Sequence, residues 1–331
     1  MDDGGHYNPS PNPFGQAGKD IALTVKQTEP LYWLCRSIEL LQQRGAAVPP
    51  VLLTGTQALA AALFKIYAKH HDLGFAVNVS SGEMAMGGST GGALGPGGLA
   101  LASRLFKRPE YLTAAMAFGE KLWHDWIVTM GMTTSAPCDT MQSPDDQSGH
   151  ELPQSLTVVY EVSGNRTFLS MALDAAYVGW APWIFHYDYQ LNGAYRITPW
   201  AVSNITEIPA GQPFASPQNR EPTPGRCVGS GVDLFRLWRY TDDEALLDMW
   251  IPTLHNQMLY MGTEARPLPG VCPGCMSERV PVGDGCNGME PGVIYGANGG
   301  WPAISAMLSA LDNPGCATRS ASSCSTTSRP A

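Results

Sequence analysis

The chain has few basic residues and lacks the segments that mark several broad classes of protein. Its 331 residues hold 20 Lys and Arg against 29 Asp and Glu, a formal net charge of −9. Nucleic acids and anionic membranes bind concentrated Lys and Arg, so we expect neither partner. No run of about 18 uncharged apolar residues stands out, which argues against a transmembrane helix. No signal peptide is visible either, and a cytoplasmic location is the default expectation.

Motifs of several enzyme classes are also missing. There is no G-x-S-x-G nucleophile elbow and no H-E-x-x-H zinc motif. The glycine-rich run 87–98 lacks the Gly-Lys-Ser/Thr ending of a phosphate-binding loop, and no strand clearly precedes it. We therefore interpret residues 79–98 as a flexible or close-approach loop at the rim of a cleft, and we predict no cofactor.

The eight cysteines are too few for a disulfide scaffold in a chain of this length. Cys272 and Cys275 form a C-x-x-C pair, with Cys286 nearby. A closed zinc site needs a fourth ligand, and no second pair lies close in the sequence. We therefore predict no metal site, with free thiols, a local disulfide or a zinc-containing scaffold as the alternatives.

Apolar residues at helical spacing indicate a chain of helical hairpins. The predicted helices cover residues 31–44, 56–70, 99–106, 111–129, 147–162, 167–183, 232–240 and 243–261. Strand evidence is limited to Leu156–Tyr160 and Val280–Val282. Helical hairpins bury their apolar faces by stacking on one another, and the irregular spacing of these copies favours a closed ring over a regular array. The 36 glycines and 27 prolines predict long, ordered loops. The fold class is therefore all-α, an (α/α) toroid of helical hairpins with long Gly/Pro-rich loops.

The two ends of the chain differ in composition from its centre. We expect an irregular lead-in over residues 1–29, a toroid domain over 30–315 and a disordered tail over 316–331. Eight of the last fourteen residues are Ser or Thr, with no apolar periodicity. The abrupt change after residue 315 suggests a truncated or frame-altered C-terminus.

The strongest candidate for chemistry is the acidic segment 143–151. Ser143 is predicted to cap a helix whose first residue is Pro144, which places Asp146 at the capping-box position. A carboxylate at a helix N-terminus that faces a cleft can also serve as an acid or base, so Asp145 and Asp146 are candidate catalytic residues. We interpret Glu151, one turn further on, as a surface carboxylate.

A second group combines aromatic rings with polar side chains, a pattern typical of sugar sites. Core packing is an equally good interpretation for Trp180, and His124 alone is more typical of a core histidine. The candidates for shaping a sugar site are His124, Trp183, Tyr187 and His255, with Asp188 as a further carboxylate and Glu278 and Arg279 as an ion pair or a substrate clamp.

Three segments together resemble the six-hairpin (α/α) glycosidase-like group, which includes unsaturated glucuronyl hydrolases and other uronate- or arabinose-acting enzymes. They are Ser143-Pro-Asp-Asp-Gln-Ser, Val158-Val-Tyr-Glu-Val-Ser-Gly-Asn, and the run from Met171 through Asp188. The resemblance covers about residues 98–310. It implies a toroid fold, a cleft carboxylate at Asp145 or Asp146, and a second at Asp188 or Glu278. A full toroid of this group needs more chain, so the ring is expected to be incomplete.

These observations favour a glycoside hydrolase acting on a poly- or oligosaccharide. Asp145, Asp146 and Asp188 would supply the acid and the base or nucleophile, and Arg279 could hold a uronate carboxylate. Two alternatives stand beside it: a polysaccharide lyase on the same fold, and a non-catalytic α/α repeat protein that binds glycans or protein partners. Two carboxylates about 5–10 Å apart across an aromatic-lined cleft would favour hydrolysis.

Overall fold

The computed structural model describes residues 20–134, 144–184, 189–190, 207–208, 231–259 and 264–265. They belong to two compact units. The first consists of Met1–Trp183 with Ser216–Asn219, and the second of Ile184–Ala215 with Arg220–Ala331. Each unit is described by itself below.

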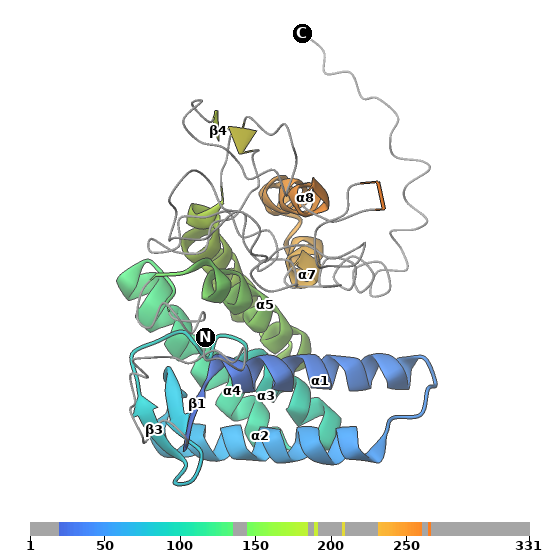
Figure 1. The fold of residues 1–331 in the computed structure, drawn as a ribbon, viewed down its shortest axis with the longest axis vertical. Coiled ribbons are helices and arrows are strands. Elements are labelled where there is room, and N and C mark those ends of the chain that lie inside the picture. The colour runs from blue at the N-terminus through green and yellow to red at the C-terminus, as the bar shows by residue number, and fades with distance from the viewer. Residues whose placement is uncertain are drawn as a thin grey trace. The chain divides into compact units, whose positions relative to one another are not determined.

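Unit one contains six α-helices and a small sheet among its described residues. In chain order its elements are β1 (Ile21–Leu23), α1 (Val25–Gln43), α2 (Pro50–His70), β2 (Ala76–Asn78), β3 (Glu83–Met86), α3 (Gly95–Phe106), α4 (Pro109–Leu122), η2 (Trp123–Met130), α5 (Asp146–Ser163), α6 (Thr167–Asp174), η3 (Ala175–Trp180) and η4 (Ala181–Trp183). The π-helices η2 and η3 continue α4 and α6 directly. In Figure 1, α1 and α2 lie side by side as a hairpin, with β1–β3 at one end.

Proline and left-handed residues set the limits of these helices. Proline occupies the first turn of α2, α3 and α4, where no backbone N–H is needed. His71, Lys107 and Gly164 have positive φ angles of 52°, 56° and 72°, and each follows the last residue of a helix. The predicted turns between paired helices at 107–110 and 163–166 are therefore present.

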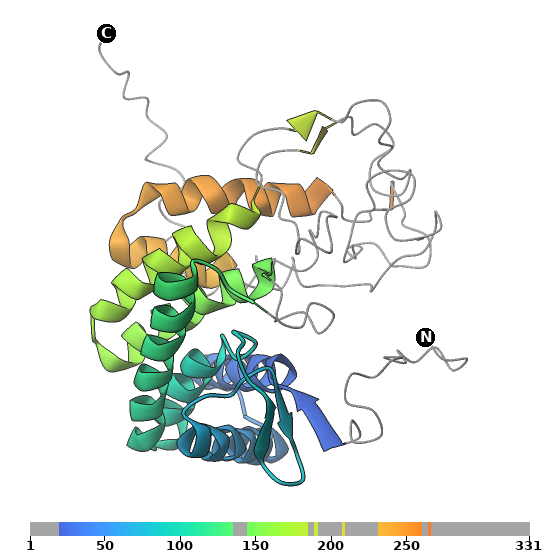
Figure 2. The same ribbon diagram turned by 90° about the vertical axis from the view of Figure 1, so that its left-hand side faces the viewer.

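The helices of unit one form an inner and an outer layer. Helix α3 packs against α1 on one side and α5 on the other, while α2 and α4 contact each other outside them. Thirteen of the eighteen residues of α5 are buried, whereas α2 buries only four of its 21. Figure 2 shows the same hairpins from the side. This alternation of inner and outer helices is the arrangement predicted for an α/α toroid.

Glycine allows the inner helices to approach closely. The amide of Gly97 on α3 donates to Ser155 Oγ on α5 at 2.7 Å. A Cβ on Gly149 of α5 would lie 2.4 Å from the carbonyl oxygen of Gly179. These contacts correct the predicted loop over residues 79–98: the segment contains β3 and the first turn of α3, and its close approach is between helices.

Several boundaries differ from the predictions. The segment 1–29, predicted to be irregular, contains β1 and the start of α1, and Pro30 lies inside that helix. Thr24 anchors the start of α1, since its hydroxyl donates to the carbonyl oxygen of Leu73 at 2.9 Å. The possible strand Leu156–Tyr160 is helical, because it lies within α5. Val280–Val282 and the tail 316–331 lie outside the described residues.

The three strands form one antiparallel sheet in the order β1-β2-β3. Ile21 pairs with Asn78, and Asn78 pairs with Glu83 across the tight β2–β3 turn. A bulge interrupts the register at Ala76 and Val77. Strands of three and four residues are too short to show an alternating pattern, so no local signal predicted them.

Helix α2 is the most apolar of the long helices among the described residues. It has 21 residues, and an 18-residue window reaches a mean hydropathy of 1.4 with 22% of its residues buried. Among the described residues, it is the one helix whose length and composition would suffice to cross a membrane. Length and composition alone do not test the expectation that the chain has no transmembrane helix, which stays a prediction.

Unit two contains a helical hairpin and a short strand pair among its described residues. Helices α7 (Gly231–Thr241) and α8 (Glu244–Leu259) pack together, as predicted for 232–240 and 243–261. The ring of Phe235 lies 5.1 Å from the rings of both Trp238 and Trp250. Strand β4 (Tyr189–Gln190) pairs with β5 (Glu207–Ile208).

Candidate functional site

The start of α5 is held by Asp145, which is fully buried. Asp145 is extended, with φ −151° and ψ 158°, and its Oδ1 accepts a hydrogen bond from the Ser148 amide at 2.8 Å. This is the geometry of an N-cap. The predicted cap at Ser143 was therefore wrong by two residues, and Asp146 is the first residue of the helix.

Hydrogen bonds hold this N-cap against the segment that follows η2. The amide of Asp145 donates to the carbonyl oxygen of Thr133, and the Thr133 hydroxyl donates to the carbonyl oxygen of Asp145 at 3.0 Å. Thr90 makes a similar double contact, because its hydroxyl donates to the Thr134 carbonyl and accepts from the Thr134 amide, both at 2.6 Å. The start of α5 is thus a rigid part of unit one.

Asp146 and His150 are buried one turn apart on α5. Asp146 is fully buried in the first turn, where the helix dipole favours a negative charge. The Nδ1 atom of His150 lies 3.1 Å from the Asp146 carbonyl oxygen. Burial lowers the pKa of His150 to about 4, so this imidazole is neutral at pH 7.

A carboxyl pair lies beside them, bridged by an amide. Gln147 Nε2 donates to Glu29 Oε1 of α1 at 2.6 Å and to Glu151 Oε1 of α5 at 2.9 Å. Glu151 is 3% exposed, whereas Glu29 is half-buried and lies 3.5 Å from the exposed ammonium of Lys26. Of the two carboxyl groups, Glu29 is the one that solvent or a ligand can reach.

The surroundings of Glu151 favour its protonated form. Burial raises its pKa well above the ordinary value of 4.5, and the negative charge of Glu29 raises it further. The hydrogen bond from Gln147 acts in the opposite direction and is the weaker effect. The protonated form of Glu151 is therefore favoured next to a second carboxyl group, and both groups accept hydrogen bonds from the same Gln147 amide.

Other polar atoms are buried near the middle of α5 and in η3. Glu151 Oε2, Gln154 Nε2 and Trp180 Nε1 have no hydrogen-bond partner among the described residues. Buried polar atoms are normally paired, and unpaired ones mark strain or a functional site. The interior around α5 is therefore more polar than packing requires.

Of the residues predicted for the site, the structure brings Asp145 and Asp146 together and leaves His124 apart. The side chain of His124 is 68% exposed and contacts Asp125 at 3.0 Å, so it is not part of the buried cluster. Trp183 is buried, with 9% exposure, at the end of η4. Tyr187, Asp188, Glu278 and Arg279 lie outside the described residues, as does the side chain of His255.

Glu29 and Gln147 were not among the predicted site residues, and Glu151 was predicted on the surface. The prediction of Glu151 as a surface carboxylate was wrong because α5 is enclosed on nearly all sides, so polar residues on every face become buried. Glu29 was assigned to the irregular lead-in because residues 1–29 are rich in Gly, Pro and Asn, and Pro30 lies within the same helix. The buried Val25, Thr28 and Tyr32, at helical spacing across that proline, were the signal for its true place.

Metal binding receives no support from the described residues. Within them, no group of three or more His, Cys, Asp or Glu side chains could hold a metal ion. Cys35 is buried on α1, and burial raises the pKa of its thiol to about 12. Cys272, Cys275 and Cys286 lie outside the described residues.

Solved structures similar to this chain include sugar isomerases and epimerases. A crystal structure of D-mannose isomerase matches with a TM-score of 0.56 and 9% identity, covering 88% of this chain and 72% of that one. The fold is an α/α toroid. The all-α toroid prediction is therefore confirmed, and so is the toroid part of the resemblance to the six-hairpin group.

Two further matches are weaker. Cellobiose 2-epimerase from Bacillus thermoamylovorans B4167 has a TM-score of 0.43, with 10% identity over 88% of each chain. Cellobiose 2-epimerase from Spirochaeta thermophila DSM 6192 has a TM-score of 0.45, with 10% identity over 90% of this chain and 88% of that one. No protein-family model and no curated protein sequence matches the chain.

Proposed function

We propose that this protein is a carbohydrate-active enzyme that isomerises or epimerises a sugar at the carbon next to its carbonyl group. The observation that carries the proposal is the Glu29–Glu151 pair, a carboxylate and a neutral acid joined through Gln147 in the inner layer of unit one. The toroid shared with a D-mannose isomerase agrees with a sugar as substrate.

The chemistry requires one proton to leave carbon and another to reach oxygen. A base removes the proton from C2 of the open-chain aldose while an acid protonates the carbonyl oxygen, giving an enediol. Returning the carbon proton to C1, with loss of the O2 proton to the base, gives the ketose. Returning it to the other face of C2, with loss of the O1 proton, gives the epimer. In the proposal Glu29 contacts the sugar, and Glu151 acts through it by exchanging a proton.

The shared donor limits the spacing of this pair. Glu29 Oε1 and Glu151 Oε1 accept hydrogen bonds from the same amide nitrogen at 2.6 and 2.9 Å, so these two oxygens lie at most about 5.5 Å apart. Inverting glycosidases hold their carboxyl groups about 6.5–9.5 Å apart to admit water, so this pair is too close for that mechanism. Asp145, a candidate in the hydrolase hypothesis, uses one oxygen to cap α5.

Proton exchange at C2 tests the proposal directly. The full chain is incubated with D-mannose and with cellobiose in D₂O, and proton NMR follows loss of the C2 signal and formation of product. We expect deuterium at C2 with at least one sugar, and a loss of about 100-fold or more in Glu29→Gln, in line with removal of an acid–base group. Glu151→Gln keeps a neutral side chain but cannot exchange a proton, so it should lower the rate as well.

Glu39→Gln provides the matched control. Glu39 also lies on α1 but binds Arg104 at 2.6 Å, away from Gln147, so this variant should retain full exchange. Absence of C2 exchange with every aldose tried would contradict the isomerase proposal. Release of product from aryl glycosides or uronides, lost in Asp146→Asn, would replace it by the hydrolase hypothesis.

A further inference from the structure

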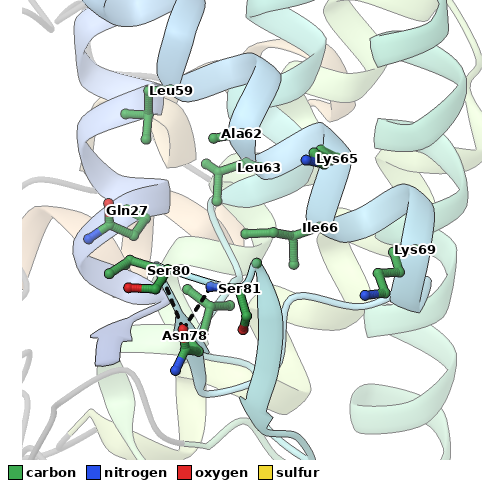
Figure 3. Close-up of a pocket in the computed structure, with 13 residues that line it drawn as sticks. Gln27, Leu59, Ala62, Leu63, Lys65, Ile66, Lys69, Asn78, Ser80 and Ser81 are labelled. Carbon is green, nitrogen blue, oxygen red and sulfur yellow. Dashed lines mark hydrogen bonds between the residues drawn. The ribbon is translucent and has the colours of Figure 1, made fainter. Parts of the chain in front are cut away.

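A cavity of about 450 Å³ lies between α2 and the β2–β3 turn. Figure 3 shows it bounded by one face of α2, the start of α1 and the turn at Asn78–Ser81. None of its lining residues belongs to the carboxylate cluster around Glu151. We propose that this cavity binds a small amphipathic carboxylate, with an aliphatic body on its floor and its acid group at Lys65.

The floor is aliphatic. Leu59, Ala62, Leu63 and Ile66 of α2 form one side, and Val77 of β2 forms another. Leu63 and Val77 are 2% and 3% exposed, so the base of the cavity is part of the core. Ligand sites of this volume are typically apolar with a few polar groups at the edge.

Aromatic rings are absent from the described residues that line the cavity. Sugar rings bind on aromatic faces, whereas flexible aliphatic chains pack against Leu and Ile. The floor therefore favours a hydrocarbon chain, and a sugar would leave its hydroxyl groups without partners there.

The turn at the rim is rigid. Asn78 Oδ1 accepts from the amides of Ser80 and Ser81 at 3.0 and 2.9 Å, as the dashed lines in Figure 3 show. The side chain of Ser81 in turn accepts from the Glu83 amide at 3.2 Å. This edge of the cavity is therefore formed before any ligand binds, which reduces the entropy lost on binding.

The charges at the rim favour an anion. Lys69 pairs with Glu83, which also lies 3.3 Å from His70 Nε2. The bond with Lys69 lowers the pKa of Glu83, so this carboxylate is ionised and neutralises Lys69. Lys65 is the lining cation that has no ion-pair partner among the described residues. The carboxylate of a bound ligand would supply an ion-pair partner for Lys65.

Isothermal titration of the full chain with decanoate, below its aggregation concentration, tests this site. We expect saturable binding of one decanoate per chain and binding of the uncharged decanol that is about fivefold weaker, as expected for loss of one exposed ion pair. Lys65→Met should weaken decanoate by the same factor and leave decanol unchanged. Lys107→Met, which removes an exposed lysine outside the cavity, should change neither.

A variant that fills the cavity provides a second test of ligand binding. Ala62→Trp places a large side chain into the cavity from an exposed position of α2, so the helix should still form and binding of both probes should be lost. Circular dichroism checks that the variant is folded. Decanoate binding that persists in Ala62→Trp, no saturable binding to the unmodified chain, or tighter binding of glucuronate than of decanoate would each overturn the proposal.

Discussion

Glu151 retains a proton under conditions in which a surface glutamate would lose it. Its carboxyl group is 3% exposed and lies beside the charged Glu29, and both features oppose a second negative charge. A carboxylic acid that keeps its proton above the ordinary titration range of glutamate can donate that proton where an ordinary glutamate has already lost it. The consequence can be measured in the stability of the protein.

Stability should fall as pH rises through the range in which the unfolded chain loses this proton. The unfolded Glu151 ionises near 4.5, whereas the folded group does so at higher pH because its pKa is raised. Between these values the folded state holds more protons, so the free energy of unfolding decreases with pH by up to about 1.4 kcal/mol per unit. Urea unfolding of Glu151→Gln across pH 4–9 should lack this decrease. Parallel curves for variant and unmodified chain would contradict it.

His150 should produce the opposite slope at lower pH. Its pKa falls from 6.5 to about 4 on folding, so the unfolded chain binds the extra proton. Acidification from pH 6.5 to 4 should therefore remove roughly 3 kcal/mol from the free energy of unfolding. The comparison is with His150→Gln, whose pH slope in that range should be flatter whatever its absolute stability. An unchanged slope would show that the imidazole is accessible to protons.

The main role of Asp145 should be to cap helix α5, not to catalyse a reaction. Asp145→Ala removes the acceptor for the Ser148 amide and should lower the free energy of unfolding by about 1–2 kcal/mol. Asp145→Asn keeps an oxygen in place and should stay close to the unmodified chain in urea unfolding and in C2 exchange. Loss of activity in a stable Asp145→Asn would instead assign the carboxylate a chemical role.

Which residues belong to the site was easier to predict than which of them are buried. The pair Asp145 and Asp146 was identified from its position before a helix, and the structure buries both. Their neighbours were missed because Glu29 comes from α1, more than a hundred residues earlier in the chain. A single sequence carries no signal for contacts between such distant residues.

Helix α5 depends on small residues where it meets the chain around η3. Gly149→Ala would place a methyl group 2.4 Å from the Gly179 carbonyl oxygen, a backbone atom that cannot move alone. We expect a loss of about 1–3 kcal/mol in the free energy of unfolding. The matched control is Gly55→Ala on α2, which meets no atom within 4 Å and should stabilise by about 0.5–1 kcal/mol. Similar effects from both variants would contradict the close packing of α5.

Helices were predicted well, and strands were not. The predicted helix 147–162 covers nearly all of α5, Asp146–Ser163. Its apolar pattern is long and ends at Gly164, a strong stop signal. The start of α1 was placed too late because proline usually begins a helix, whereas Pro30 lies within this one. Strands β1–β3 depend on pairing across the sheet, which no local pattern of three residues can reveal.

At the scale of the whole molecule, the toroid fold was predictable but its chemistry was not. Stacked helical hairpins follow from periodicity, and the same toroid supports hydrolysis, elimination and isomerisation. The hydrolase prediction rested on resemblance in short segments. The contact between Glu29 and Glu151 depends on the folded arrangement, and it shifts the proposal to proton transfer at carbon.

Unit one should fold without the rest of the chain. Its described helices contact one another in succession, from α1 through α6, and its described buried core lies within residues 20–183. A fragment of these residues should give a helical circular dichroism spectrum and one cooperative urea transition. It should also keep the pH-dependent difference between the unmodified fragment and Glu151→Gln. A gradual, non-cooperative transition would show that unit one requires other segments.

Because α5 is enclosed by other helices, it should be the last part of unit one to become exposed to solvent. Leu152, Leu156 and Val159 are fully buried, so water reaches their amides only after neighbouring helices separate. Helix α2, with most of its surface already exposed, can fray without disturbing that core. The amide hydrogens of α5 should therefore exchange with deuterium last, at a rate that reports the opening of the entire unit. The exchange rate of the α5 amides would then measure how cooperatively unit one unfolds.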